Sequence, residues 1–159
     1  MLNEKKKFII VAVALLLIML ACGVWFALQN RSIDIDPNSG NYESSLKRPE
    51  NIGQSKILIP GYGEWTMKKG SDTIESVLFN PEGNPCFFKF EIIERDNGDV
   101  LYQSRLVPPG QGISPIKLSK TFNEVGTYNV VLKFQSVDLE DQKTNYNGSD
   151  VEVKLNVVE

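Results

Sequence analysis

The stretch VEVKLNV, residues 151–157, decides the fold class of this 159-residue chain. Valine or leucine occupies every second position, and Glu152, Lys154 and Asn156 lie between them. Because successive side chains of a β-strand point to opposite faces, this alternation predicts a strand with one buried and one solvated face. The stretch YNVVLKF, residues 128–134, alternates in the same way and predicts a second strand.

Five further apolar runs, bounded by turn residues, predict additional strands at residues 56–59, 73–79, 86–92, 100–106 and 113–118. Asn97 and Gly98 lie between two of these runs and favour a two-residue hairpin turn with positive φ. No helical period follows residue 28. Residues 56–159 are therefore predicted to form an all-β domain, an immunoglobulin-like antiparallel β-sandwich of about seven strands.

Two residues have predicted structural roles in this sandwich. Tyr128 stands beside small residues at the start of a late strand, which is typical of a tyrosine corner, whose hydroxyl binds upstream backbone. Cys86 shares the inward face of its run with two phenylalanines, which predicts an inaccessible thiol with a raised pKa. The other cysteine, Cys22, lies in a very different setting, so the sandwich is expected to have no disulfide.

Residues 8–28, FIIVAVALLLIMLACGVWFAL, contain no charged side chain. A helix of this length spans about 30 Å, which matches the hydrocarbon core of a bilayer. Three lysines at positions 5–7 precede it, and positive residues tend to stay in the cytoplasm. Residues 1–28 are therefore predicted to be a cytoplasmic tip and the transmembrane anchor of a single-pass membrane protein, whose C-terminal domain is extracellular.

Cys22 leaves a second tethering mode open. Residues 19–23, MLACG, resemble a bacterial lipobox, in which the cysteine is lipidated and becomes the mature N-terminus. The apolar run continues to Leu28, where a lipoprotein would have a polar tether, and this favours the uncleaved helix. In both cases residues 29–55, rich in Asn, Ser, Asp and Gly, are predicted to be a flexible linker, because they offer little apolar surface to bury.

The composition excludes several classes of active site. The chain has no histidine, so Ser-His-Asp and Cys-His sites and His-ligated zinc are excluded. Its 17 basic and 20 acidic residues give a net charge of −3, which offers no basic surface for nucleic acid. Neighbouring Ser119 and Lys120 would point to opposite faces of a strand, so they are not expected to form a catalytic dyad.

Two groups of acidic residues are candidate sites. Asp138, Glu140, Asp141 and Asp150 flank a loop, but an EF-hand would need glycine where the chain has Lys143, so a solvated connection is favoured over a metal site. The carboxylates of a glycosidase need a defined separation across a cleft, and the strand and turn at residues 91–99 carry no pocket signature around Glu91, Glu94, Asp96 and Asp99. The sequence therefore predicts no catalytic residue, no cofactor and no enzymatic activity.

Four groups of residues carry a resemblance to a known family. They are Ile59-Pro60-Gly61-Tyr62, Asn80-Pro81-x-x-Asn84-x-Cys86-x-Phe88, Leu101-Tyr102-x-Ser104-x-x-Val107-x-Pro109-Gly110 and Gly126-x-Tyr128. With the apolar N-terminus, they resemble an uncharacterised family of small membrane-anchored β-sandwich proteins of Gram-positive bacteria. The resemblance covers residues 57–158 and the anchor, and it implies architecture without implying an activity.

Tyr62, Trp65 and Tyr102 are the candidate binding residues, because tyrosine and tryptophan combine rigid contact area with a polar group. They could form one exposed patch or cover the rim of the sandwich. The first functional hypothesis is a non-enzymatic adaptor that binds another envelope or surface protein. The alternative is a module in which these aromatic residues bind cell-wall polymer or a small ligand. A contiguous aromatic platform would favour the alternative, and an open sheet edge would favour the adaptor.

Overall fold

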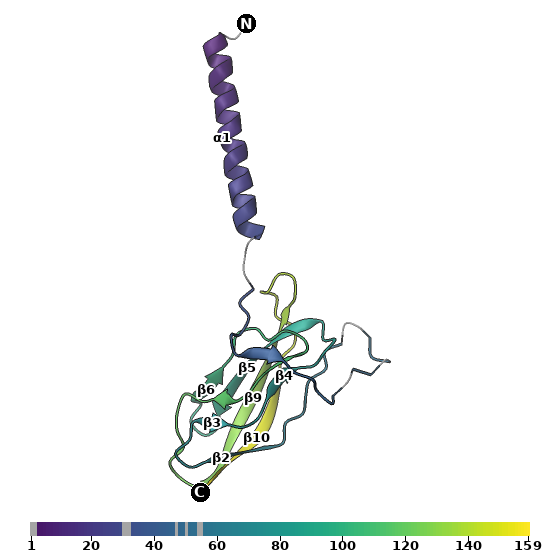
Figure 1. The fold of residues 1–159 in the computed structure, drawn as a ribbon, viewed down its shortest axis with the longest axis vertical. Helices are drawn as coiled ribbons and strands as arrows, with labels where there is room; N and C mark the ends of the chain where they lie inside the picture. The colour runs from purple at the N-terminus through teal and green to yellow at the C-terminus, as the bar shows by residue number, and fades with distance from the viewer. Residues whose placement is uncertain (1–2, 30–32, 47, 50, 54–55) are drawn as a thin grey trace. The chain divides into compact units, whose positions relative to one another are not determined.

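The computed structural model describes residues 3–29, 33–46, 48–49, 51–53 and 56–159. Contacts divide the chain into two compact units, Met1–Ile33 and Asp34–Glu159. The first contains one helix and the second is built from β-strands (Figure 1). The predicted combination of an apolar N-terminal helix with a β-rich domain is therefore confirmed.

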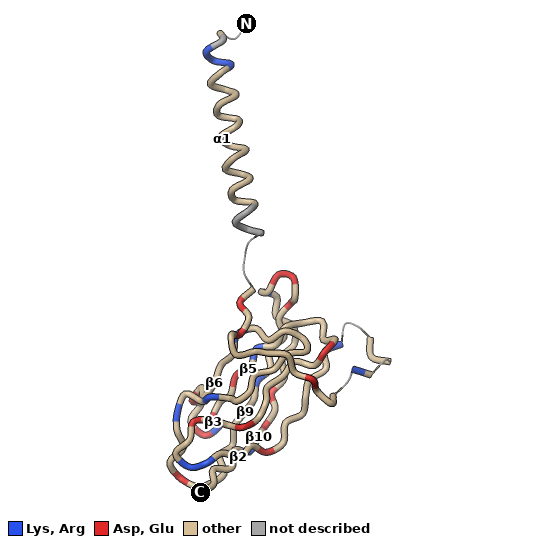
Figure 2. Tube along the Cα trace, in the orientation of Figure 1, with Lys and Arg blue, Asp and Glu red and all other residues tan. Residues whose placement is uncertain are grey.

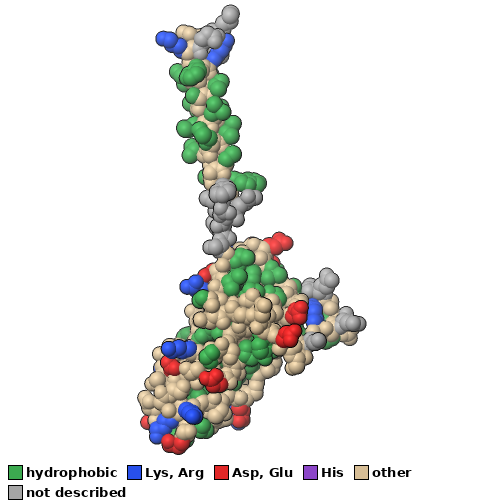
Figure 3. Space-filling model, viewed as in Figure 1, with side chains coloured by type: hydrophobic (Ala, Val, Ile, Leu, Met, Phe, Trp, Pro, Cys, Tyr) green, Lys and Arg blue, Asp and Glu red, His purple; other side chains and the backbone are tan. Residues whose placement is uncertain are grey.

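Helix α1 is formed by Glu4–Gln29. Its segment Lys5–Trp25 is long and apolar enough to cross a membrane, and none of it is buried. Basic side chains lie only at its N-terminal tip among the described residues of the helix (Figure 2), and hydrophobic side chains cover most of its remaining length (Figure 3). A water-exposed helix of this composition would leave its whole apolar surface unburied, which favours a lipid environment.

The described residues of the β unit form three sheets. The largest has the strand order β2-β10-β9-β5-β6. The others have the orders β1-β7-β4 and β3-β8. The strands are β1 (Ser39–Asn41), β2 (Glu64–Lys68), β3 (Thr73–Ile74), β4 (Leu78–Asn80), β5 (Cys86–Glu94), β6 (Val100–Gln103), β7 (Gln111–Ile113), β8 (Ile116–Lys117), β9 (Gly126–Asp138) and β10 (Ser149–Val158).

Strands β9 and β10 form the centre of the large sheet, as their alternation predicted. They pair antiparallel with Val153 opposite Val130, and β5 pairs antiparallel with the other edge of β9. Strand β2, in contrast, runs parallel to β10, with Trp65 opposite Leu155. The expectation of a purely antiparallel arrangement is therefore wrong for this pair, because the chain returns to the sheet edge in the direction of its last strand.

The core lies against the inner face of the large sheet. The rings of Phe88, Phe90 and Phe134 meet edge to face, with centroids 5.4–5.9 Å apart. This geometry matches the positive edge of one ring with the negative face of the next. Apolar side chains at alternate positions of β10 complete the layer, and Val153 and Leu155 are almost fully buried.

Three predicted strands differ in the structure. Residues 56–59 form no strand, because Leu58 binds the side chain of Asn84 instead of a neighbouring strand. The run 73–79 divides into β3 and β4, which belong to different sheets, and a turn in which Ser76 N–H donates to the Ile74 carbonyl follows β3. The run 113–118 likewise divides between β7 and β8.

The predicted hairpin turn is also longer than expected. Gly98 has a positive φ of 76°, but Asn97 does not, and the connection between β5 and β6 comprises residues 95–99. Gly98 N–H donates to the Glu94 carbonyl at 2.9 Å, and Glu94 N–H donates to the Asp99 carbonyl at 2.9 Å. Only the glycine therefore adopts the left-handed conformation that the sequence predicted.

The predicted linker contains structured residues. Asp36 is 5% exposed and accepts hydrogen bonds from Asn38 N–H at 2.9 Å and Arg105 N–H at 2.8 Å. Ile35 forms a parallel bridge with Leu106, and β1 pairs with β7. The β unit therefore begins at Asp34 and not at residue 56, because distant backbone groups stabilise a segment whose own composition is polar. The linker residues 30–32, 47, 50 and 54–55 lie outside the described residues.

Candidate functional site

Tyr62, Trp65 and Tyr102 do not form one patch. Trp65 lies on β2 and is 4% exposed, so its ring belongs to the core. Tyr102 lies on β6, at the opposite edge of the five-stranded sheet. The structure brings together only Tyr62 and Trp65, whose ring centroids are 6.0 Å apart. Of the two arrangements that the sequence left open, one exposed patch of these three residues is therefore excluded.

Tyr62 is held in a row of aromatic rings. Its hydroxyl accepts a hydrogen bond from Phe79 N–H at 3.1 Å, and its ring lies 6.3 Å from that of Phe79. Burial raises the pKa of this hydroxyl far above its usual value. Tyr42 extends the row, with its ring 5.0 Å from Phe79. Neither Tyr42 nor Phe79 was predicted, because the former lies in the supposed linker and the latter was counted as a strand residue.

Tyr102 is half-buried beside a surface cavity of about 680 Å³ that Ser114, Lys117 and Ser119 also line. Burial raises the pKa of its hydroxyl to about 12, and the neighbouring Asp36 carboxylate contributes to the shift. The phenol therefore stays protonated at neutral pH and can act only as an ordinary hydrogen-bonding group.

The two cysteines have different surroundings. Cys86 is fully buried, and burial raises the pKa of its thiol, an effect that the neighbouring Ser136 hydroxyl partly opposes. The prediction of an inaccessible thiol is confirmed. Cys22 is exposed on α1, so its side chain is available to the surrounding phase. Neither arrangement provides the cationic environment that activates a thiolate.

Two asparagines of the family resemblance form a buried network. Asn80 donates to the carbonyls of Cys86 and Val107, both at 2.9 Å. Asn84 donates to the Asn80 side-chain oxygen at 2.8 Å and binds both backbone groups of Leu58. Buried amide groups need such partners to offset their lost hydration. These motif residues therefore attach Leu58, in the segment before β2, to the connection between β4 and β5, and they have a structural role.

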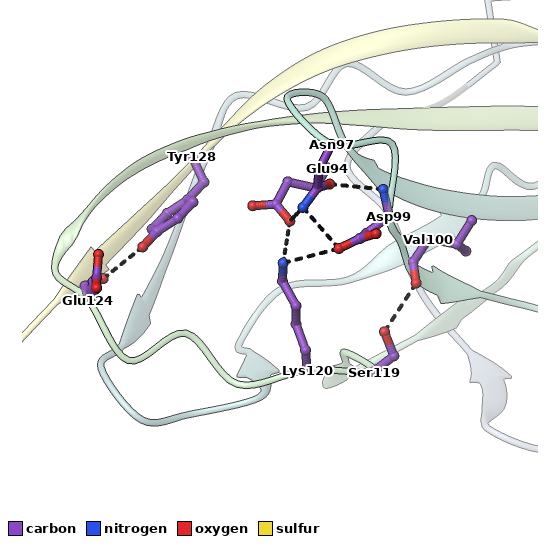
Figure 4. Close-up of polar contacts among 8 residues, drawn as sticks. All are labelled: Glu94, Asn97, Asp99, Val100, Ser119, Lys120, Glu124 and Tyr128. Carbon is purple, nitrogen blue, oxygen red and sulfur yellow. Dashed lines mark hydrogen bonds and ion pairs between the residues drawn. The ribbon is translucent and has the colours of Figure 1, made fainter.

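Lys120 lies next to two carboxylates at the connection between β5 and β6 (Figure 4). Its ammonium forms an ion pair with Glu94 and lies 3.6 Å from the Asp99 carboxylate. The Glu94 side chain is only 9% exposed because it lies on the inward side of β5. Asn97 donates a hydrogen bond to its carboxylate at 2.9 Å. The ion pair raises the pKa of Lys120. The lysine is therefore a protonated counterion and not a nucleophile.

Residues 119–124, which we call the covering segment, have two further attachments. Ser119 binds β6, with its N–H on the Leu101 carbonyl at 2.7 Å and its hydroxyl on the Val100 carbonyl at 3.1 Å (Figure 4). At the other end, the Tyr128 hydroxyl donates to the Glu124 carbonyl at 3.2 Å. The upstream backbone bond predicted for Tyr128 is therefore present. Ser119 and Lys120 bind different groups, so they form no dyad.

The acidic loop after β9 uses its carboxylates internally. Asp138 accepts hydrogen bonds from Glu140 N–H at 2.7 Å, from Asp141 N–H at 3.0 Å and from the Tyr146 hydroxyl. Asp141 accepts from the N–H groups of Lys143 and Thr144, both at 2.8 Å. These bonds lower the pKa of both aspartates. In the described part of the chain, no three side chains of metal-binding type lie together.

The chain matches no protein-family model, no curated protein and no solved structure. The resemblance to membrane-anchored proteins of Gram-positive bacteria therefore remains a prediction from the sequence motifs. In the structure, Asn80, Asn84, Cys86 and Tyr128 have buried or bridging roles, so the motif residues explain the fold more directly than they indicate a ligand.

Proposed function

We propose that this chain is a non-enzymatic interaction module tethered to a membrane by α1. The observation that carries the proposal is the fully exposed apolar segment Lys5–Trp25, followed closely by a separate compact β unit. A helix of this kind needs lipid around it, whereas the β unit has its own core. The arrangement suits a domain that is held near a membrane to contact another envelope or surface protein.

For the β unit we propose an immunoglobulin-like sandwich. The adjacent strands β10, β9, β5 and β6 follow the order of strands G, F, C and C′ in variable-type immunoglobulin domains. The bond from Tyr128 at the start of β9 to the Glu124 carbonyl corresponds to the tyrosine corner before strand F. The strand pairs β4-β7 and β3-β8 would then supply the second layer. Such sandwiches serve many unrelated functions, so the fold alone does not identify a partner.

Three features support a role without catalysis. The chain has no histidine. The thiol of Cys86 is fully buried. The carboxylate of Glu94 and the ammonium of Lys120 neutralise each other. General acid–base or nucleophilic catalysis needs a group that is both accessible and poised near the working pH.

The proposed topology puts the N-terminus in the cytoplasm and the β unit outside, because of the three lysines before the apolar segment. Protease added to intact, wall-stripped cells should release a compact fragment. Since Asp36 binds Arg105 and β1 pairs with β7, both belong to the β unit, and the fragment should begin before Asp34. Cleavage only after lysis would place the domain in the cytoplasm and contradict the proposal.

The same experiment separates the two tethering modes. Mass spectrometry of the residual anchor should give an unmodified peptide that retains Met1 or Leu2 if α1 remains uncleaved. A peptide that begins at a diacylated Cys22 would identify a lipoprotein. Crosslinking of the intact chain in living cells then identifies partners without any assumption about chemistry.

A ligand-binding role is the second candidate, and the Tyr42–Phe79–Tyr62 row favours it. Tyr42 is 37% exposed and borders a cavity of about 460 Å³, together with Glu43, Arg48 and Glu82. A tyrosine face beside charged side chains could stack on a sugar ring. Cosedimentation with purified cell-wall polymer should then depend on the ring, with Tyr42→Ala abolishing binding and Tyr146→Ala, in the acidic loop, leaving it unchanged. Equal binding by the two variants would rule out this role for the row.

A further inference from the structure

The outer edge of β2 carries backbone groups that point away from the sheet. Lys69 N–H donates to the Val158 carbonyl at 2.7 Å. Because backbone groups of a strand point alternately to its two neighbours, the N–H and C=O groups of Trp65 and Met67 also point toward β10. Glu64, Thr66 and Lys68 therefore direct their N–H and C=O groups outward. Among the described residues, only Ser71 binds one of these groups, the Lys68 carbonyl at 3.0 Å.

A surface groove of about 550 Å³ borders this edge. It is lined by Thr66, Met67 and Lys68 of β2, by Val158 of β10 and by Ser71, Thr73 and Glu75, which follow β2 in the chain. No third strand pairs with β2 in the described part of the chain. An edge of this kind is a template for an added strand unless charges or a cover prevent it.

The sequence of β2, EWTMK, is complementary to itself. If two copies pair antiparallel about Thr66, Glu64 of each copy faces Lys68 of the other, and the two Thr66 residues face each other. Registers centred one residue away would place each of these charges opposite threonine or beyond the paired segment. Unlike charges and threonine pairs directly opposite each other stabilise antiparallel strands, and like charges destabilise them.

We propose that β2 joins a second copy of this chain, forming a two-fold dimer with one continuous sheet of ten strands. The occupant is a second copy because the charge pattern satisfies itself under two-fold symmetry, where each contact occurs twice. The outward backbone groups of Glu64 and Thr66 and the N–H of Lys68 lie in the positions that such pairing requires, and the Lys68 carbonyl, which accepts from Ser71 N–H, has a second lone pair for it. The inference goes beyond the proposed function, since it requires neither the orientation in the membrane nor a partner protein.

Disulfide trapping tests the register. The test uses the full chain in detergent micelles, with Cys22→Ala to remove the exposed thiol; Cys86 is buried. Facing residues of a hydrogen-bonded antiparallel pair have Cα atoms about 5.5 Å apart, a separation that a disulfide spans. Thr66→Cys should therefore crosslink to itself rapidly under mild oxidation. Thr127→Cys, an exposed threonine on the inner strand β9, is the matched control and should crosslink no faster than random collision allows.

Exchanging the charges of Glu64 and Lys68 tests whether these two side chains pair across the dimer. Lys68→Glu creates two Glu–Glu contacts in each dimer, and we expect it to weaken dimerisation about tenfold or more. The double variant Glu64→Lys with Lys68→Glu reverses both charges and should restore dimerisation to near the starting level. Sedimentation of the full chain in density-matched detergent measures the dissociation constant of each variant.

Three results would overturn the proposal. They are a monomer at all concentrations, equal crosslinking at positions 66 and 127, and a double variant that dimerises no better than Lys68→Glu. Failure of the dimer leaves the membrane topology unaffected, because protease accessibility in cells is a separate measurement.

Discussion

The two edge strands of the five-stranded sheet, β6 and β2, differ in how many of their outward backbone groups are hydrogen-bonded. At the β6 edge, Ser119 binds the carbonyls of Val100 and Leu101, and Asp36 binds the N–H of Arg105 just beyond the strand. At the β2 edge, Glu64 and Thr66 direct their backbone groups outward. The first edge is covered by the chain itself, whereas at the second the Lys68 carbonyl alone of these outward groups has a backbone partner among the described residues, Ser71 N–H.

This difference shows how the chain uses its irregular segments. Both covers of the β6 edge are non-strand residues: the segment that follows the helix, and the covering segment at residues 119–124. Each supplies one charged side chain to the sheet: buried Asp36 binds Arg105 N–H just beyond β6, and half-buried Lys120 binds Glu94 on β5. Covering an edge in this way prevents uncontrolled strand pairing. The β2 edge, where Glu64 and Thr66 keep outward backbone groups without a partner among the described residues, is the one whose charges are self-complementary, so the asymmetry supports the proposed contact at β2.

The largest expected effect comes from removing a cover of the β6 edge. Asp36→Ala leaves the N–H groups of Asn38 and Arg105 without their carboxylate and should lower the free energy of unfolding by about 2–4 kcal/mol. Denaturant unfolding of the full chain in detergent, followed by tryptophan fluorescence, measures the change. Asp34→Ala is the matched control, because Asp34 contacts Arg105 with a side chain that is 67% exposed, and it should cost less than about 1 kcal/mol. Equal effects would mean that residues 34–36 do not stabilise this edge.

A smaller effect is expected at the covering segment. Lys120→Met leaves the Glu94 carboxylate without its counterion, and we expect a loss of about 1–2 kcal/mol, less than for a fully buried pair because Lys120 is 37% exposed. Since the pKa of Lys120 is raised in the folded state, its contribution is complete below the ordinary value of 10.5 and is lost as the pH rises through the folded-state value.

The difference in unfolding free energy between wild type and Lys120→Met should therefore shrink from pH 7 to strongly alkaline pH. Lys117→Met is the control, because Lys117 is 77% exposed and lies 3.8 Å from Asp72. It should change stability by less than about 0.5 kcal/mol. A pH-independent difference for Lys120→Met would show that packing of its alkyl chain accounts for its effect, and neither the ion pair nor the cation–π contact with Phe122.

A third effect on stability is expected at Glu124, the last residue of the covering segment, which Tyr128 binds. Tyr128→Phe removes the hydroxyl that donates to Glu124 but keeps the edge-to-face contact with Phe122, whose ring centroid is 4.7 Å away. The expected loss of stability is about 0.5–1.5 kcal/mol, the net contribution of one hydrogen bond. An unchanged midpoint in thermal and denaturant unfolding would mean that the Tyr128–Glu124 bond does not hold this segment in place.

The comparison of edges also shows what the sequence could predict. Strands β5, β9 and β10 were predictable because alternation extends over seven or more residues in each, and Cys86 and Tyr128 followed from their positions in these runs. The edges were not predictable from local pattern. Asp36 lies in a polar stretch, and its partner Arg105 is 69 residues away. Glu94 and Lys120 are 26 residues apart, and β2 is a five-residue strand whose partner is the last strand of the chain. Such long-range pairs leave no periodic signal in either segment.

The smallest effect on stability is expected at the open edge. Thr66→Ala should change the free energy of unfolding by less than about 0.5 kcal/mol, because Thr66 is exposed and its backbone faces away from β10.

Amide hydrogen exchange then tests the direction of these backbone groups residue by residue. At protein concentrations low enough to give monomers, the Thr66 amide should exchange much faster than that of Met67, which faces β10, and faster than that of Arg105, which donates to Asp36. If two copies pair through β2, exchange at Thr66 should slow as the concentration rises, while Met67 and Arg105 stay protected throughout. A Thr66 amide as slow as that of Met67 at the lowest concentration would mean that the β2 edge is covered within a single chain, and the contrast between the two edges would fail.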